Sequence, residues 1–317
     1  MNFTQISEID YDWLAPFFEG QNYELCEYSL PGILAWSSSS YFPCAAVKEG
    51  RLLLGAEYPG HAEYRHLVLP LGGDEPDPAE LAAIARETGF AKYWFVPQAY
   101  LDRHGIELIH QFFQIIEQAG YHDYVYDVRD LADLKGNRYA KKRNLIKQFQ
   151  RVYAPERLVF ESISSANSRQ CIAFLEEWCE QEGCFGQGNA SLECEMEAAV
   201  NMLGLVERGR TQGLVLRIDT VISALAVASP LVEGMVALQF QKACKSIKGL
   251  YQFFDQECAR SLCQGFALVN KESDMGKEGL AQAKSSYHPV RMIYAYALQL
   301  LDSENGTELS QVKEDGL

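Results

Sequence analysis

A dense run of polar residues lies near the C-terminal end of the chain, between Asn270 and Pro289. It follows an expected strand and opens an expected helix, and ligands of α/β proteins usually bind where strands end. On that helix Lys284 and Tyr287 are three residues apart, so both side chains could reach one ligand. The candidate catalytic residues of this run are Lys271, Glu272, Asp274, Lys284 and Tyr287.

Each residue type in this run suits one step of a group transfer. A buried lysine could stabilise a developing oxyanion or a phosphate, and a tyrosine could protonate a leaving oxygen or sulfur. Glu272 or Asp274 could accept a proton from an attacking amine. The alternative is that these side chains cap a helix and form surface ion pairs, and that Gly276 and Gly279 only permit a turn and close packing.

A second candidate region is a strongly basic segment near the middle of the chain. The net charge is −15, with 28 basic and 43 acidic residues, yet residues 135–151 contain seven basic and no acidic residues. This acidic total argues against a protein that coats nucleic acid or lies flat on an anionic membrane. The basic segment therefore indicates a local site for one phosphate-bearing group.

The basic segment is expected to form a helix over residues 138–153, capped by Asn137, with one apolar face. Arg138 and Lys141 would lie in its first turn, where the helix dipole disfavours cations by about 0.3–1 kcal/mol each, and a bound phosphate would offset this cost. Arg138 and Lys142 should point toward the groove where the helix packs. The alternative is a solvated connector whose cations pair with the acidic halves.

The elements on either side of this helix repeat one order: hairpin, strand, helix, strand, helix, strand. In the first half, the pattern predicts a hairpin at 44–55, a helix at 78–88, an amphipathic helix at 105–119 and a strand at 124–128. In the second half, it predicts a hairpin at 213–229, a strand at 235–243, helices at 249–263 and 277–287, and a strand or helix at 291–298. This order suggests a structural duplication in a mixed α/β (α+β) fold.

Several common functional signatures are absent from the sequence. It contains no GxSxG, Walker-type, HExxH or GxGxxG motif, and no set of residues completes a metal site, so no metal is expected. No secretory signal or spanning segment is visible, and the nine cysteines include no CxxC pair. These features predict a cytoplasmic location and unpaired, mostly buried thiols.

Three segments resemble those of a known bacterial family, the proteins related to the C-terminal domain of phosphatidylglycerol lysyltransferase. The closing motif runs from Asn270-Lys271-Glu272 through Gly276 and Gly279 to Pro289, a second motif spans 135–144, and Cys26-Glu27-Tyr28-Ser29 resembles an early segment. The similarity covers most of residues 10–297. It implies two tandem GNAT-type acyltransferase lobes, each a mostly antiparallel sheet flanked by helices.

The resemblance also implies an activity. Characterised relatives, including the more distant Fem peptidyltransferases, move an aminoacyl group from tRNA to an amine or a lipid hydroxyl. The expected reaction is therefore aminoacyl transfer from aminoacyl-tRNA, or acyl transfer from acyl-CoA, with no tightly bound cofactor. The acceptor would be a small molecule, a peptide or a lipid.

The sequence departs from the family pattern at two places. Many relatives carry Glu where Gln241 precedes Lys242, and an amide cannot act as a base. The loop Lys245–Gly249 lies where an acetyltransferase has its glycine-rich pyrophosphate loop, but it contains one glycine. Gln241 favours an alternative function, a non-catalytic protein that binds anions or nucleotides on a degenerate GNAT fold.

The sequence therefore predicts four segments: a GNAT-like lobe at 1–134, a basic bridging helix at 135–154, a second lobe at 155–300 and an acidic flexible tail at 301–317. The donor's phosphates are expected to contact six basic side chains, Arg138, Lys141, Lys142, Arg143, Lys245 and Lys248.

Overall fold

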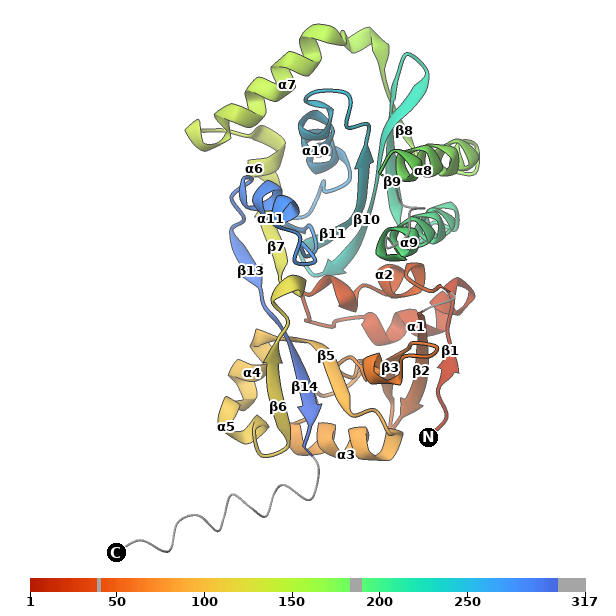
Figure 1. Ribbon diagram of the computed structural model, residues 1–317, viewed down its shortest axis with the longest axis vertical. Coiled ribbons are helices and arrows are strands. Elements are labelled where there is room, and N and C mark those ends of the chain that lie inside the picture. Colours follow the sequence, from red (N-terminus) through yellow and green to blue (C-terminus); the bar gives the residue numbers. More distant parts are fainter. Residues whose placement is uncertain (39–40, 183–189, 302–317) are drawn as a thin grey trace, which may run out of the picture.

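The fold consists of two stacked lobes, each built on a seven-stranded sheet, as shown in Figure 1. The structure is a computed structural model and describes residues 1–38, 41–182 and 190–301. Both sheets are mostly antiparallel and carry helices, which confirms the predicted mixed α/β class. The predicted tail at 302–317 lies outside the described residues.

The first sheet has the order β1-β2-β3-β4-β5-β14-β6, and β4–β5 is its one parallel pair. The hairpin β2–β3 turns at Glu49-Gly50, as the sequence predicted. The strands are β1 (Thr4–Gln5), β2 (Phe42–Lys48), β3 (Arg51–Glu57), β4 (His66–Leu67), β5 (Lys92–Pro97), β6 (Phe113–Glu117) and β14 (Ala295–Leu300). The helices of this lobe are α1 (Tyr11–Phe18), α2 (Leu30–Ala35), α3 (Pro78–Thr88), α4 (Gln98–His104) and α5 (Ile106–Ile109).

The second sheet has the order β13-β7-β12-β11-β10-β9-β8, and β11–β12 is its one parallel pair. The strands are β7 (Asp123–Asp127), β8 (Leu158–Ser162), β9 (Gln212–Ile218), β10 (Val221–Val232), β11 (Met235–Ala243), β12 (Leu268–Asn270) and β13 (Arg291–Ile293). The helices are α6 (Val128–Asp133), α7 (Ala140–Val152), α8 (Ser168–Glu182), α9 (Ala190–Glu207), α10 (Leu250–Ser261) and α11 (Glu278–Ser285). The shared hairpin–strand–helix–strand order of the two sheets agrees with the duplication suggested by the sequence.

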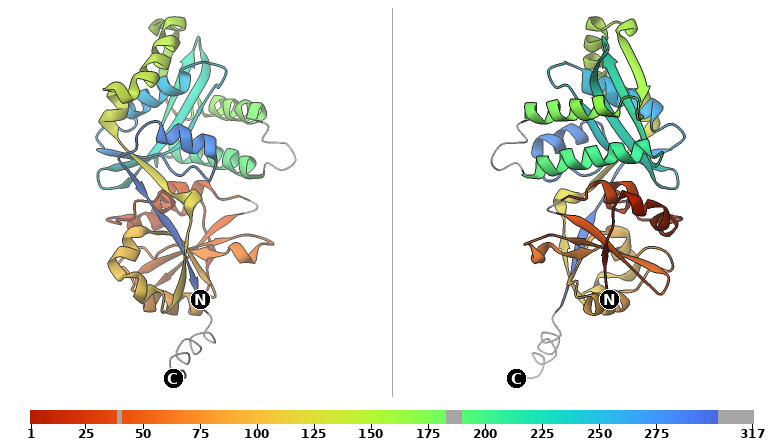
Figure 2. Two further views of the ribbon diagram at one scale, coloured as in Figure 1. Left: turned by 60° about the vertical axis from the view of Figure 1, so that its left-hand side comes forward. Right: turned by 90° about the vertical axis from the view of Figure 1, so that its right-hand side faces the viewer.

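Each lobe receives one strand from the other half of the chain. Strand β7 falls inside the predicted first segment, 1–134, but pairs with β12 and β13 of the second sheet. Strand β14 falls inside the predicted second segment, 155–300, but lies between β5 and β6 of the first sheet. Figure 2 shows both connections crossing from one lobe to the other. The two sheets therefore do not follow the predicted segment boundaries.

The second sheet is covered on both faces. Alternate residues of a strand face opposite sides, so Leu225 and Val227 of β10 join a core that includes α8, α9 and the first lobe. Ala224 and Ala226 face the other way, into a core formed with α6, α7 and α10. Helices α8 and α9 thus cover this face of the sheet, with α9 packed against α2 of the first lobe, while the basic helix packs on the opposite face.

The predicted amphipathic helix at 105–119 is wrong. Helix α5 ends at Ile109, and residues 113–117 form β6, which pairs along its whole length with β14. Ile116, assigned to the buried face of the expected helix, is 44% exposed. The pairing partner comes from almost two hundred residues further along the chain, so a local pattern could not reveal it.

Other local predictions were closer to the structure. The basic segment forms a 3₁₀ turn at Asn137–Tyr139 followed by α7, although Asn137 does not cap the helix. The stretch 291–298 contains β13 and the start of β14, which belong to different sheets. Among the described residues six cysteines are unpaired, but Cys179 forms a disulfide, so the prediction of unpaired thiols is wrong for that residue. Among the described residues, no helix combines the length and apolar character needed to cross a bilayer.

Candidate functional site

The candidate site is built around the loop that follows β12, next to the boundary between the lobes. Asn270, the last residue of β12, is fully buried. Its side-chain amide donates to the Asp123 carboxylate (2.7 Å) and to the Glu24 carbonyl (2.8 Å), while its Oδ1 accepts from the Glu272 backbone N–H (2.7 Å). Glu272 has φ +59°, a conformation that side chains usually avoid. Asn270 therefore fixes a sharp turn that sends Lys271 and Glu272 to different surroundings.

Lys284 of α11 holds this turn in place. Its ammonium donates to three backbone carbonyls, those of Lys271 (2.6 Å), Glu272 (3.0 Å) and Ser273 (2.5 Å). These bonds use all three donors of the ammonium group. Burial lowers the pKa of Lys284, while the charges of Glu272 and Asp123 oppose that shift. A lysine bound in this way positions the loop, and its donors are already occupied.

Lys271 and Tyr287 meet on the side of the loop that faces the basic helix. The Lys271 ammonium forms an ion pair with Asp255 of α10 and lies 5.3 Å from the centre of the Tyr287 ring. Lys142 of α7 approaches the same ring at 3.8 Å and donates to Ser286 Oγ (2.6 Å). We refer to Lys142, Asp255, Lys271 and Tyr287 as the Asp255 cluster.

The Asp255 cluster is shielded from solvent and mixes two cations with one carboxylate. Burial and the Asp255 carboxylate raise the pKa of the Tyr287 hydroxyl well above its usual value, so it stays protonated at neutral pH. Burial lowers the pKa of Lys142, and Asp255 partly restores it. Such a group can polarise a carbonyl and supply a proton in one place.

Glu272 and Asp274 separate from the Asp255 cluster. Asp274 accepts hydrogen bonds from the Tyr124 hydroxyl (2.6 Å) and from the Gly276 N–H (2.8 Å), which closes a local turn. Glu272 lies toward Asp123 and Glu27, and burial raises its pKa to about 8, with Lys284 opposing the shift and Asp123 adding to it. A pKa of about 8 lies close to neutral pH, which suits Glu272 to proton transfer.

The six basic side chains expected to contact phosphate do not form one site in the structure. Arg138 forms an ion pair with Asp130, which supplies the anion expected at the helix start, and Arg143 donates to the carbonyls of Leu134 and Gly136. Lys142 belongs to the Asp255 cluster. Lys141 is exposed and, among the described residues, makes no hydrogen bond or ion pair; Lys245 and Lys248 are exposed at the loop before α10.

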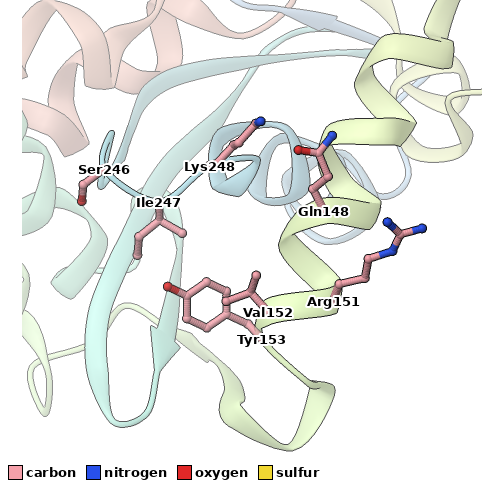
Figure 3. Close-up of a pocket in the computed structure, with 7 residues that line it drawn as sticks. All are labelled: Gln148, Arg151, Val152, Tyr153, Ser246, Ile247 and Lys248. Atoms are coloured by element: carbon pink, nitrogen blue, oxygen red, sulfur yellow. The ribbon is translucent and has the colours of Figure 1, made fainter.

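Lys248 lines a pocket of about 370 Å³ between the last turns of α7 and the loop before α10. Figure 3 shows the Tyr153 ring next to Val152 and facing Ile247, with Lys248 beyond Ile247 and the Arg151 guanidinium directed away from the Tyr153 ring. The remaining lining residues are Gln148 and Ser246. An apolar floor with a cationic rim suits a ring that carries phosphate.

Sequence reasoning missed several residues of this site. Asp255 lies within an ordinary amphipathic helix, and Arg151 was only one of the seven basic residues counted in 135–151. Asp123 lies at the start of a strand whose partner strands could not be predicted. In the structure Asp255 and Asp123 are buried carboxylates, with 4% and 0% exposure. In the sequence the one available signal was an acidic residue within a segment expected to be buried. Burial of that kind requires a partner, but the sequence does not identify it.

Within the described residues, one group of side chains is close enough together to hold a metal ion. It consists of Cys26, Glu27 and Asp123, whose ligand atoms all lie within 4.8 Å of one another. Burial, followed by the charges of Asp123 and Glu27, raises the pKa of the Cys26 thiol. No metal is included in the reaction proposed below.

The fold and site together define a two-lobed α/β protein with a buried lysine–tyrosine cluster beside a basic helix. The chain matches the family model described as "Phosphatidylglycerol lysyltransferase, C-terminal" over residues 26–299. It therefore belongs to that family, as the three motifs indicated. No curated protein matches it by sequence.

Two solved structures show the same fold over nearly the whole chain. A conserved protein of unknown function from Bacteroides thetaiotaomicron is 25% identical, with a TM-score of 0.83, covering 95% of this chain and 100% of that chain. The C-terminal domain of a putative lysylphosphatidylglycerol synthetase from Agrobacterium fabrum is 14% identical, with a TM-score of 0.62 and 95% coverage of both chains. The second likeness concerns the fold alone.

Proposed function

We propose that this protein is an acyltransferase that moves an aminoacyl group from aminoacyl-tRNA, or an acyl group from acyl-CoA, to an amine or hydroxyl acceptor. Membership of the lysyltransferase family supports acyl transfer as the class of reaction. The observation that carries the proposal is the contact of Lys142, on the basic helix, with the buried Tyr287. It joins a surface suited to phosphate to a group suited to acyl transfer.

In this proposal the two ends of α7 contact different parts of the donor. Arg151 and Lys248 hold a phosphate-bearing ring at the pocket, and Lys141 and Lys142 face the reactive end. Lys142 and Arg151 are nine positions apart, which is about 13.5 Å along the helix axis and about two and a half turns, so their side chains leave opposite sides of α7. A donor must therefore extend over at least that length to place its carbonyl beside Tyr287.

The transfer step proceeds by attack of the acceptor on the donor carbonyl. Lys271 and Lys142 stabilise the negative charge that forms on the carbonyl oxygen. As the bond to the leaving oxygen or sulfur breaks, the Tyr287 hydroxyl gives that atom its proton. Glu272, directly or through water, takes the proton that the attacking amine or hydroxyl loses. Asp255 orients both Lys271 and Tyr287.

Transfer is tested by incubating the protein with radiolabelled aminoacyl-tRNAs or acyl-CoAs and a cell extract that supplies acceptors. We expect label to move from one donor class, and Tyr287→Phe to lower the rate about 10²-fold or more, since general acid catalysis contributes 10²–10⁴-fold. Tyr287→Phe retains the ring that packs on Lys142, so its melting temperature should stay close to that of the wild type.

The matched control for the donor site is Arg86→Ala, which removes an exposed cation on α3 in the other lobe. Arg151→Ala with Lys248→Ala should weaken donor binding at least tenfold, whereas Arg86→Ala should not. If no label moves from either donor class, the protein is not a transferase of this kind.

One feature favours the alternative, a non-catalytic anion- or nucleotide-binding protein. Gln241 occupies the position at which many relatives carry Glu, and the adjacent Lys242 pairs instead with Glu195 of α9. A binding protein would retain its donor affinity in the Tyr287→Phe variant and show no transfer in either form.

A further inference from the structure

Three carboxylates and one thiol converge beside the loop after β12, on the side away from the Asp255 cluster. Cys26 and Glu27 lie in the 3₁₀ turn Cys26–Tyr28, Asp123 begins β7, and Glu272 follows β12. Asn270 joins two of them, because it donates to Asp123 and accepts from the Glu272 N–H. We call Glu27, Asp123 and Glu272 the acid triad.

Among the described residues no cation forms an ion pair with the acid triad, although the charge of Lys284 opposes the rise that burial causes in the pKa of Asp123 and Glu272. Asp123 Oδ2 accepts from the Cys26 N–H and from Asn270, both at 2.7 Å, while Oδ1 has the Cys26 thiol at 3.5 Å. Glu27 Oε2 is screened from solvent and has no hydrogen-bond partner. A buried carboxylate oxygen without a partner is costly, so it indicates a missing donor.

The nearby lysines are already engaged. Lys284 donates its three N–H groups to backbone carbonyls, and Lys242 forms an ion pair with Glu195. Burial raises the pKa of Glu27, Asp123 and Glu272 above the usual range, and repulsion by Asp123 adds to the shift for the other two. Repulsion of this kind is relieved when a ligand brings a positive charge.

The surroundings favour an organic cation over a metal ion. After burial, the charges of Cys44 and then Glu27 raise the phenol pKa of Tyr41, and the charge of Glu27 raises the phenol pKa of Tyr121. Tyr121 in turn contacts Phe95 edge to face at 5.3 Å. Carboxylates next to aromatic rings are the usual setting for an ammonium group. Asp123 Oδ2 already accepts two hydrogen bonds from N–H donors, so its lone pairs are less available to a metal ion.

We propose that the acid triad binds a primary ammonium group of the substrate, with Glu27 Oε2 as its main acceptor. The ammonium belongs either to the aminoacyl group of the donor or to an amine acceptor. Lys271 and Glu272 are adjacent in sequence, so the Asp255 cluster and an ammonium on the triad would lie on opposite sides of one turn. The inference rests on the proposed function for its role in transfer, while the binding itself is independent of transfer.

Binding is tested by calorimetry on the full chain with four probes: L-alaninamide for the aminoacyl source, 1-aminopentane for an amine acceptor, uncharged N-acetyl-L-alaninamide and Zn²⁺. We expect at least one of the two amines to bind, N-acetyl-L-alaninamide not to bind, and Glu27→Gln to weaken binding at least tenfold. Glu107→Gln is the control, since it changes the net charge equally at an exposed residue of α5.

The folding of the variant is checked separately. Glu27→Gln removes a buried charge and should melt no lower than the wild type, and Glu27→Asp should retain part of the affinity. Equal affinity in Glu27→Gln, no binding of either amine, or stoichiometric Zn²⁺ binding without amine binding would each overturn the proposal. Label transfer without ammonium binding would overturn this inference alone; ammonium binding without transfer would overturn the proposed function alone.

Discussion

At the scale of single residues, the side chains of the closing motif lie on two sides of one turn. Lys271 and Tyr287 face Asp255, while Glu272 faces the acid triad, although Lys271 and Glu272 are neighbours in sequence. The positive φ of Glu272 and the three bonds of Lys284 make this separation rigid. Some residues of the closing motif, such as Lys284, therefore hold the loop in place, while others, such as Lys271 and Glu272, are the candidate reactive groups.

Replacing Lys284 by methionine should destabilise the protein by about 3 kcal/mol or more. The change removes three charge-assisted hydrogen bonds and leaves buried carbonyls without a donor, and bonds to charged groups are worth about 1.5–3 kcal/mol each. Urea unfolding would measure the loss. The control, Lys277→Met, alters an exposed lysine just before the same helix and should stay within about 0.5 kcal/mol of wild type. Equal stability of the two variants would contradict the anchoring role.

At the scale of elements, the basic helix is held directly against the start of α10. Gly249, with φ +83°, precedes α10, and a Cβ at this position would overlap the carbonyl oxygen of Leu145 in α7. Phe149 of α7 and Phe253 of α10 stack with ring centroids 4.7 Å apart. This close approach brings the loop at Lys248 beside Arg151 and so forms the pocket.

Gly249→Ala should therefore force the two helices apart. We expect a loss of about 2–4 kcal/mol, since overpacking typically costs 1–3 kcal/mol and the left-handed backbone adds about 1–2 kcal/mol. Gly89→Ala is the matched control, because Gly89 has the same left-handed backbone (φ +75°, ψ +13°) but open space around it, and should lose only the backbone contribution. Chemical denaturation of both variants separates the two costs; equal losses would show that the close approach has no energetic weight.

At the scale of the whole molecule, the exchange of β7 and β14 makes each lobe depend on the other half of the chain. Strand β14 fills the position between β5 and β6, and β7 fills the position between β12 and β13. A core of apolar side chains also continues from the first lobe into α8, α9 and one face of the second sheet. These connections leave little opportunity for independent folding.

The full chain should accordingly unfold in one transition. Far-ultraviolet circular dichroism and tryptophan fluorescence should report the same midpoint, since Trp36 and Trp94 belong to one lobe and Trp178 to the other. Fragments 1–134 and 135–301, expressed separately, should show no cooperative melting. Two resolved transitions, or a fragment that melts cooperatively alone, would show that the lobes are independent.

The sequence by itself determined the features that depend on neighbouring residues. The hairpin at Glu49-Gly50, the helix at 78–88, the basic helix and the family motifs follow from periodicity, turn residues and spacing, which act over a few residues. Where pairing came from far away, local pattern misled: residues 113–117 look like part of an amphipathic helix until β14 pairs with them.

Only the tertiary structure decided how the functional side chains are grouped. Asp255 and Asp123 became parts of the site because folding buries each beside groups from distant segments, and the sequence carries no record of that proximity. The exchange of β7 and β14 was decided in the same way. Pairing of strands and burial of charge are properties of contacts between remote residues, so they appear only when the chain is folded.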